Sequence, residues 1–287
     1  MKSGQGLRNA LTVDVEEYFQ VCAFEGVIAP EEWENWPSRL EPVMQRLLDL
    51  LAQREVKATF FVLGWVAERH PRLIQRLVAE GHELASHGYA HVRADRQSPE
   101  LFFKDVLRTR LLLEDLGGVA VVGYRASTYS IHRGNLWALQ RLREAGYRYS
   151  SSIYPIHHDL YGMPDAPRFP FRRTPDSVIE IPVTTLEWAG RRFPCGGGGF
   201  FRLYPYFLSR WALRRINREE GRSALFYCHP WEFDPEQPRP AGLGWKGRFR
   251  HYLNLRRTWP RFERLVGDFS WDRMDRVFAE AIGEGEM

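Results

Sequence analysis

The sequence predicts an α/β fold in which a parallel sheet of about seven strands forms a barrel. Short apolar runs alternate along the chain with longer segments of helical periodicity. The run at 58–63 is apolar throughout, which is typical of a parallel strand covered on both faces. The 287 residues are enough for one large domain. We therefore expect a single domain over residues 1–287, with a core at about 10–240 and a C-terminal helical extension at about 245–287.

The individual elements follow from periodicity and from helix start and stop signals. The expected strands are 10–15, 82–85, 119–122, 147–151, 178–183 and 224–228, in addition to 58–63. Helices are expected at 38–51, where Ser38 and Glu41 form a capping box, and at 71–80, 101–116, 135–145, 206–218 and 270–282.

Composition excludes several classes of protein. The net charge of +4 is mild, and no basic helix interleaved with aromatic residues indicates a nucleic-acid partner. Three cysteines without a paired motif suit a reducing compartment. Neither a signal peptide nor a membrane span is visible, so we expect a cytoplasmic protein without stable membrane insertion. The arginine-rich stretch at 239–264 is interpreted as a solvated face, with an anionic glycan or membrane surface as the alternative.

Two histidines in the stretch Ser86-His87-Gly88-Tyr89-Ala90-His91 are the first candidate metal ligands. On one helical turn, imidazoles four residues apart face the same way and can bind one divalent cation. A buried run precedes them, and the carboxyl ends of strands are where α/β enzymes place their chemistry.

Three other predicted strands also end in polar residues that packing alone does not explain. Asp14 and Glu16 follow the first strand, Arg125 the fourth and His229 the seventh. In a barrel these ends converge on one face. They would bring together metal ligands, a spare carboxylate, a guanidinium and another imidazole, which together indicate a metal-assisted hydrolase.

These residues lie in motifs that resemble the polysaccharide deacetylase family (NodB-homology carbohydrate esterases), and more narrowly the exosortase-associated deacetylases of bacterial exopolysaccharide loci. In chain order the five resembling motifs are 12–19, 86–91, 123–129, 149–155 and 229–235. The segment 196–205 is similar to the C-terminal region of the narrower subgroup. The resemblance covers about residues 10–240 and implies a distorted (β/α)7 barrel of the NodB-homology type.

The resemblance also implies roles for the site residues. His87, His91 and a carboxylate would bind a divalent cation of the zinc type, while Asp14 would act as general base, held by Arg125. His229 would act as general acid, and Tyr129 and Trp231 would contact the substrate. Because strand side chains alternate, Glu16 is the better candidate than Glu17 for the carboxylate ligand.

Two positions depart from the family pattern. Ser127 stands where the family usually has proline, and Ser150 stands where it usually has an aspartate that tunes the acid histidine. Glu232 or Asp234 are candidates to replace that aspartate.

Three functions remain open from the sequence. The first is a metal-dependent hydrolase that removes N-acetyl groups from sugars of an exopolysaccharide or its precursor, with an N-acetylated glycan as substrate. The second is a hydrolase of small cyclic amides, and the third is a catalytically silent carbohydrate-binding protein. The sequence does not indicate an oligomeric state.

Overall fold

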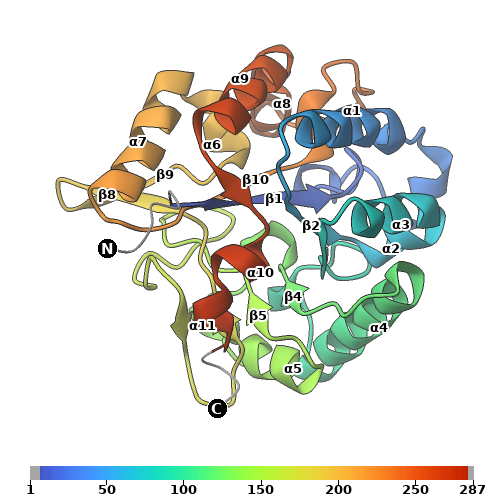
Figure 1. The fold of residues 1–287 in the computed structure, drawn as a ribbon. Coiled ribbons are helices and arrows are strands. Elements are labelled where there is room, and N and C mark those ends of the chain that lie inside the picture. The colour runs from blue at the N-terminus through green and yellow to red at the C-terminus, as the bar shows by residue number, and fades with distance from the viewer. Residues whose placement is uncertain (1–6, 284–287) are drawn as a thin grey trace.

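The computed structural model describes residues 7–283 and shows one curled sheet with helices around its outside (Figure 1). The strands of this sheet are β1 (Asn9–Val15), β2 (Thr59–Val62), β3 (Glu83–Ser86), β4 (Gly123–Tyr124), β5 (Tyr149–Ser150), β6 (Phe171–Arg172), β7 (Ile179–Glu180), β10 (Leu225–Cys228) and β11 (Trp271–Asp272). Their order is β10-β1-β2-β3-β4-β5-β7-β6, with β11 paired to β1. Every pairing is parallel except β6 with β7. The predicted α/β class and distorted barrel are confirmed, and the curled sheet is an open half-barrel.

The helices connect successive strands or pack beyond the sheet. They are α1 (Leu40–Gln53), α2 (Gly64–Arg69), α3 (Pro71–Ala79), α4 (Pro99–Gly117), α5 (Ala138–Glu144), α6 (Gly198–Leu203), α7 (Tyr206–Arg218), α8 (Trp245–Tyr252), α9 (Leu255–Asp268), α10 (Met274–Val277) and α11 (Ala279–Gly283). The expected helices at 71–80, 101–116 and 206–218 correspond closely to α3, α4 and α7. None of the helices in residues 7–283 has both the length and the apolar character needed to cross a bilayer.

Alternation along the central strands places their side chains in two of the three hydrophobic clusters of the core. Phe60 and Val62 of β2 belong to the larger cluster, which also contains residues of α1, α3 and α4. Phe61 between them belongs to a second cluster, which contains Tyr149 and Tyr227. The sheet is therefore covered on both faces, as the apolar sequence of its strands predicts.

Several expected elements are wrong in extent or type. The fourth strand is Gly123–Tyr124 and not 119–122, and Val119 is exposed. The hairpin of β8 (Thr185–Trp188) and β9 (Arg191–Pro194) was not expected. The segment 270–282 is not one helix, because Trp271–Asp272 pairs with β1 before α10 and α11 begin. The C-terminal extension is thus not purely helical.

Candidate functional site

Glu16, His87 and His91 form a buried group that could hold a metal ion. Their candidate ligand atoms all lie within 4.8 Å of one another. Glu16 Oε2 lies 2.9 Å from His91 Nε2 and 4.0 Å from His87 Nε2. One carboxylate and two imidazoles are ligands that zinc and similar cations accept, and they leave coordination positions open. No other group of three His, Cys, Asp or Glu side chains within residues 7–283 has this arrangement.

The two histidines come from a loop, so their expected position on a helical turn is wrong. His87 directly follows β3, and the chain then turns through Gly88, with φ of +77°, and reaches His91, with φ of +55°. The left-handed conformation of Gly88 is available to glycine at no steric cost. A Cβ there would also lie 3.1 Å from the Asp105 carboxylate. This turn, and not helical periodicity, brings both rings to Glu16.

The polar atoms around the group fit a bound cation. His87 Nδ1 lies 2.8 Å from the backbone oxygen of Arg125, to which it donates, so the lone pair is on Nε2, which faces Glu16. Glu16 Oε2 and His91 Nδ1 are buried, and neither makes a hydrogen bond of good geometry within residues 7–283, although Glu16 Oε2 lies 2.9 Å from His91 Nε2. A cation bound between the carboxylate and the imidazoles would satisfy these atoms.

Glu17 lies on the other side of the chain, as strand alternation predicts. Its carboxylate accepts hydrogen bonds from the hydroxyl of Ser38 and from the backbone N–H of Arg39, the latter at 3.1 Å. Ser38 is consequently not the cap of α1, which begins after Arg39 without a side-chain cap. The expected capping box with Glu41 is wrong, because Glu17 takes the serine hydroxyl.

Asp14 and Arg125 form a buried ion pair beside the histidine group. Arg125 Nη1 lies 2.5 Å from Asp14 Oδ1 and 2.9 Å from Thr12 Oγ1. Its other nitrogens donate to the backbone oxygen and the hydroxyl of Ser151, each at 3.1 Å. Arg125 is fully buried, so this network fixes both the guanidinium and the carboxylate that it holds.

Ser150 stands where the family usually has aspartate, and it belongs to a buried hydrogen-bond network. This network also contains the carboxylate of Glu180. Ser150 Oγ donates to Ser152 Oγ at 2.8 Å, and Ser150 is the register partner of Glu180 on β7. Glu180 Oε1 accepts from the backbone N–H groups of Ser152 and Ile153, each at 2.8 Å. Burial raises the pKa of Glu180 to about 7. Glu180 was not identified from the sequence as a residue near the site, although a single acid inside the apolar run 178–183 could have indicated it.

His229 extends from the end of β10 and has carboxylates near both ring nitrogens. Its Nε2 lies 3.8 Å from Asp14 Oδ2 and 3.7 Å from Glu16 Oε1. Its Nδ1 lies 3.2 Å from Glu232 Oε2, and Glu232 is in turn held by Arg202 at 2.7 Å. Glu232 is therefore the carboxylate that accompanies His229, whereas Asp234 pairs with Arg39 at 2.7 Å. Arg202 was not identified from the sequence.

Burial disfavours the charged forms of the site residues, and the neighbouring charges oppose this effect on their pKa values. Burial would raise the pKa of Glu16, but His91, and then His229, lower it to about 2. Burial disfavours the imidazolium of His229, yet Glu232 and the other acids raise its pKa to about 9. Burial lowers the pKa of His87 to about 4. His87 is thus neutral and able to bind a metal at neutral pH, while His229 carries a proton that it can donate.

Tyr129 and Trp231, the two expected substrate contacts, are both buried. Trp231 Nε1 donates to Glu16 Oε1 at 3.0 Å, and its ring stacks between those of His229 and His251. Tyr129 has φ of +49° and a hydroxyl without a hydrogen-bond partner, and its ring lies 5.7 Å from the Arg125 guanidinium carbon. The structure therefore places Trp231 as a support for Glu16 and Tyr129 beside Arg125.

The fold and this group of side chains define an α/β protein with a candidate metal centre at the carboxyl ends of its strands. Residues 33–150 match the polysaccharide deacetylase family, and residues 151–279 match a domain of unknown function, DUF3473. The first match contains His87, His91 and Arg125. Asp14 and Glu16 precede this match, and His229 lies in the second one.

Relatives are similar to part of this chain, and a solved structure has the same fold. A peptidoglycan-N-acetylglucosamine deacetylase from Bacillus cereus is 36% identical over 75 residues, and a chitooligosaccharide deacetylase from Sinorhizobium fredii is 40% identical over 76 residues. Each alignment covers 26% of this chain, and 27% and 35%, respectively, of those relatives. A crystal structure described as a polysaccharide deacetylase from Mycobacterium smegmatis superimposes with a TM-score of 0.63 at 20% identity, covering 98% of this chain and 93% of that one, and shows the same fold.

Proposed function

We propose that this protein is a metal-dependent hydrolase that removes N-acetyl groups from the sugars of a bacterial exopolysaccharide or its precursor. The observation that carries the proposal is the convergence of three groups of side chains at one edge of the sheet. They are the two histidines with Glu16, Asp14 with Arg125, and His229 with Glu232. The family of residues 33–150 and the named activities of the relatives support the N-acetylated sugar as substrate.

Glu16, His87 and His91 would hold the cation, for which we propose zinc. When bound, a cation of this kind polarises the acetamide carbonyl and lowers the pKa of a water molecule. His87 Nε2 is available as a ligand because Nδ1 donates to the Arg125 backbone oxygen. Trp231 fixes the orientation of Glu16 by donating to its other oxygen.

The remaining residues of the site would move protons. Arg125 occupies Asp14 Oδ1, so Oδ2 is left to take the proton from the attacking water. His229 Nε2, on the same side, would donate a proton to the leaving amine. Glu232 holds the opposite ring nitrogen and stabilises the protonated form, which is the role that the family aspartate would have at Ser150. The side chain of His229 is 18% exposed, whereas those of Glu16 and His87 are 2% and 3% exposed, so the sugar approaches from the His229 side.

The experiment measures metal content and acetate release for the wild type and for two matched variants. Glu16→Gln should lose bound zinc and activity, whereas Glu17→Gln should keep both, because the Glu17 carboxylate accepts from Ser38 and Arg39 at the start of α1 and is not in the metal group. The substrates are oligomers of N-acetylglucosamine, with allantoin as the cyclic amide. Hydrolysis of allantoin alone would support the cyclic-amide alternative. A folded, metal-loaded protein that hydrolyses neither and binds the oligomers would be a silent carbohydrate-binding protein.

A further inference from the structure

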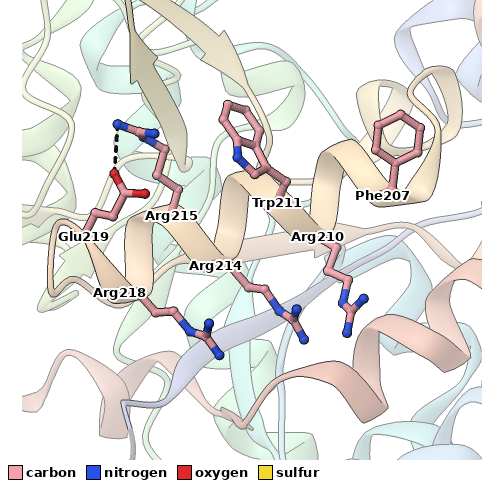
Figure 2. A pocket seen from close by; sticks show the side chains of 7 residues that line it. All are labelled: Phe207, Arg210, Trp211, Arg214, Arg215, Arg218 and Glu219. Carbon is pink, nitrogen blue, oxygen red and sulfur yellow. Dashed lines mark ion pairs between the residues drawn. The ribbon is translucent and has the colours of Figure 1, made fainter.

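A surface on the far side of the molecule from α4 combines exposed aromatic rings with arginines that lack partners. We call it the α7 surface, and it consists of Trp188 and Phe193 on the β8–β9 hairpin with Phe207, Trp211, Arg214 and Arg218 on α7 (Figures 1 and 2). A surface cavity of about 340 Å³ runs along α7, and none of the residues that line it belongs to the metal or proton-transfer groups. The α7 surface is therefore separate from the candidate active site.

Three of the four aromatic side chains are joined by ring contacts. Trp188 packs edge-to-face against Trp211 with ring centroids 5.9 Å apart, and Phe193 lies 6.3 Å from Trp188. Phe207 is one turn of α7 before Trp211. The exposed fractions are 66% for Phe207, 52% for Trp188, 41% for Trp211 and 38% for Phe193. Large apolar side chains are rarely exposed side by side unless they contact something.

Trp188 stands at the turn of a hairpin that pairs only with itself. Ala189 and Gly190 connect β8 to β9 with φ of +50° and +71°, which is a two-residue turn. Arg191 directly follows the turn and is exposed. The hairpin thus presents an indole and a guanidinium together at its end.

The arginines extend from the flank of α7 that the aromatic side chains leave free. Figure 2 shows Arg210, Arg214 and Arg218 in a row on one flank of the helix, with Trp211 and Phe207 on the other. Arg210 is held by Asp268 at 2.9 Å, but no hydrogen bond or ion pair within residues 7–283 is found for the side chains of Arg214 and Arg218. The one carboxylate that lines the cavity, Glu219, is already paired with Arg215 at 2.8 Å.

We propose that the α7 surface binds the headgroup layer of an anionic membrane. Indole and phenyl side chains are favoured at the level of lipid headgroups, and arginines beside them attract anionic lipids. The charge of the surface is complementary to such a layer, because within residues 7–283 no ion pair is found for Arg214 or Arg218. The inference does not depend on the proposed deacetylase activity, since no residue of that site is involved.

Two other occupants suit the surface less well. A sugar-binding site needs amide or carboxylate side chains to bond hydroxyl groups, and here the only lining carboxylate is already paired. The Trp188 and Trp211 rings are also 85° apart, so they form no flat platform. A second copy of the chain, joined by two-fold symmetry, would place the arginines of one copy near those of the other.

The test is flotation of the full chain with vesicles of phosphatidylcholine alone and of phosphatidylcholine mixed equally with phosphatidylglycerol. We expect binding to the mixed vesicles only, weakening as salt is added. Each arginine near an anionic surface contributes about fivefold to partitioning. Arg214→Gln with Arg218→Gln should therefore reduce binding by about 25-fold. Phe207→Ser with Trp188→Ser should abolish it, because the anchoring rings are lost.

The matched control removes the same charge elsewhere. Arg72→Gln with Lys104→Gln changes exposed residues of α3 and α4 and should leave vesicle binding unchanged. Equal loss in the control and in the arginine variant would overturn the proposal. So would binding to soluble polygalacturonate through these arginines without binding to vesicles, or a concentration-dependent dimer that the Phe207→Ser and Trp188→Ser changes dissociate.

Discussion

The two halves of the chain differ in regularity. In the first half, β1, β2 and β3 pair over four residues each and alternate with helices. In the second half, β5, β6 and β7 have two residues each, and irregular chain over 151–170 separates the first two of them, although β10 still pairs with β1 over four residues. The chain as far as residue 150 supplies the candidate metal ligands and Arg125, and the second half brings His229 and Glu232 to them from the end of β10.

Arg125 holds Asp14 and also contacts Ser151 in the second half, so its removal should have the largest effect on stability. Arg125→Met would leave Asp14 buried without its partner, which typically costs about 3 to 5 kcal/mol. It would also remove the donors that Arg125 provides to Ser151 in the second half. Urea unfolding of the variant measures this cost.

The matched variant removes both charges. Asp14→Asn combined with Arg125→Met should recover part of the loss, because no unpaired charge remains. A loss below about 1 kcal/mol for the single change would mean that Asp14 and Arg125 do not form this buried pair in solution.

The second prediction tests whether the second half supplies only the acid. His229→Ala should lower the turnover for acetate release by about 10²–10⁴-fold, the usual contribution of a positioned acid or base. Zinc content and unfolding midpoint should stay close to those of the wild type, because the ligands come from the other half. His132→Ala, a change of an imidazole outside the site, is the control. Zinc lost together with activity would contradict this division of roles.

Local signals explain what could be predicted from the sequence. The strands at 10–15, 58–63 and 224–228 and the helices α3, α4 and α7 were predicted correctly, because long apolar periods and terminal signals are local. The turn at Gly88 and His91 was not predicted, because its left-handed backbone depends on tertiary contacts, which hydrophobic periodicity does not reveal. Likewise, Arg202 and Glu180 reach the site or its supports through tertiary packing alone.

The third prediction compares a buried carboxylate in each half. Burial raises the pKa of Glu83 in β3 and of Glu180 in β7 from 4.5 to about 7. Between pH 4.5 and about 7, the two carboxyl groups stay protonated in the folded chain but lose their protons in the unfolded chain. The contribution of these two groups to stability is therefore complete below pH 4.5 and is lost as the pH rises through about 7. A shift of this size corresponds to about 3 kcal/mol for each group.

Glu180→Gln and Glu83→Gln should each flatten the fall in stability over this pH range, and the double variant should nearly abolish it. The measurement is the free energy of unfolding in urea from acid to neutral pH. If the halves unfold together, either change will affect one shared transition. Two transitions, each altered by only one of the variants, would show that the halves are independent.

The smallest expected effect concerns Ser38, where local sequence signals and tertiary contacts disagree. A capping box would couple Ser38 to Glu41, but in the structure the Ser38 hydroxyl bonds to Glu17, while Glu41 lies 3.0 Å from His70 Nδ1. A double-mutant cycle of Ser38→Ala with Glu17→Gln should therefore give a coupling of about 1 kcal/mol, as for a normal hydrogen bond. The cycle of Ser38→Ala with Glu41→Gln should give a coupling of about zero.

Ser98→Ala serves as a reference, because Ser98 does cap α4 by accepting from the N–H of Leu101 at 3.3 Å. The loss of this cap should cost about 1 kcal/mol. A coupling to Glu41 as large as that to Glu17 would show that the local signal prevails at this helix start.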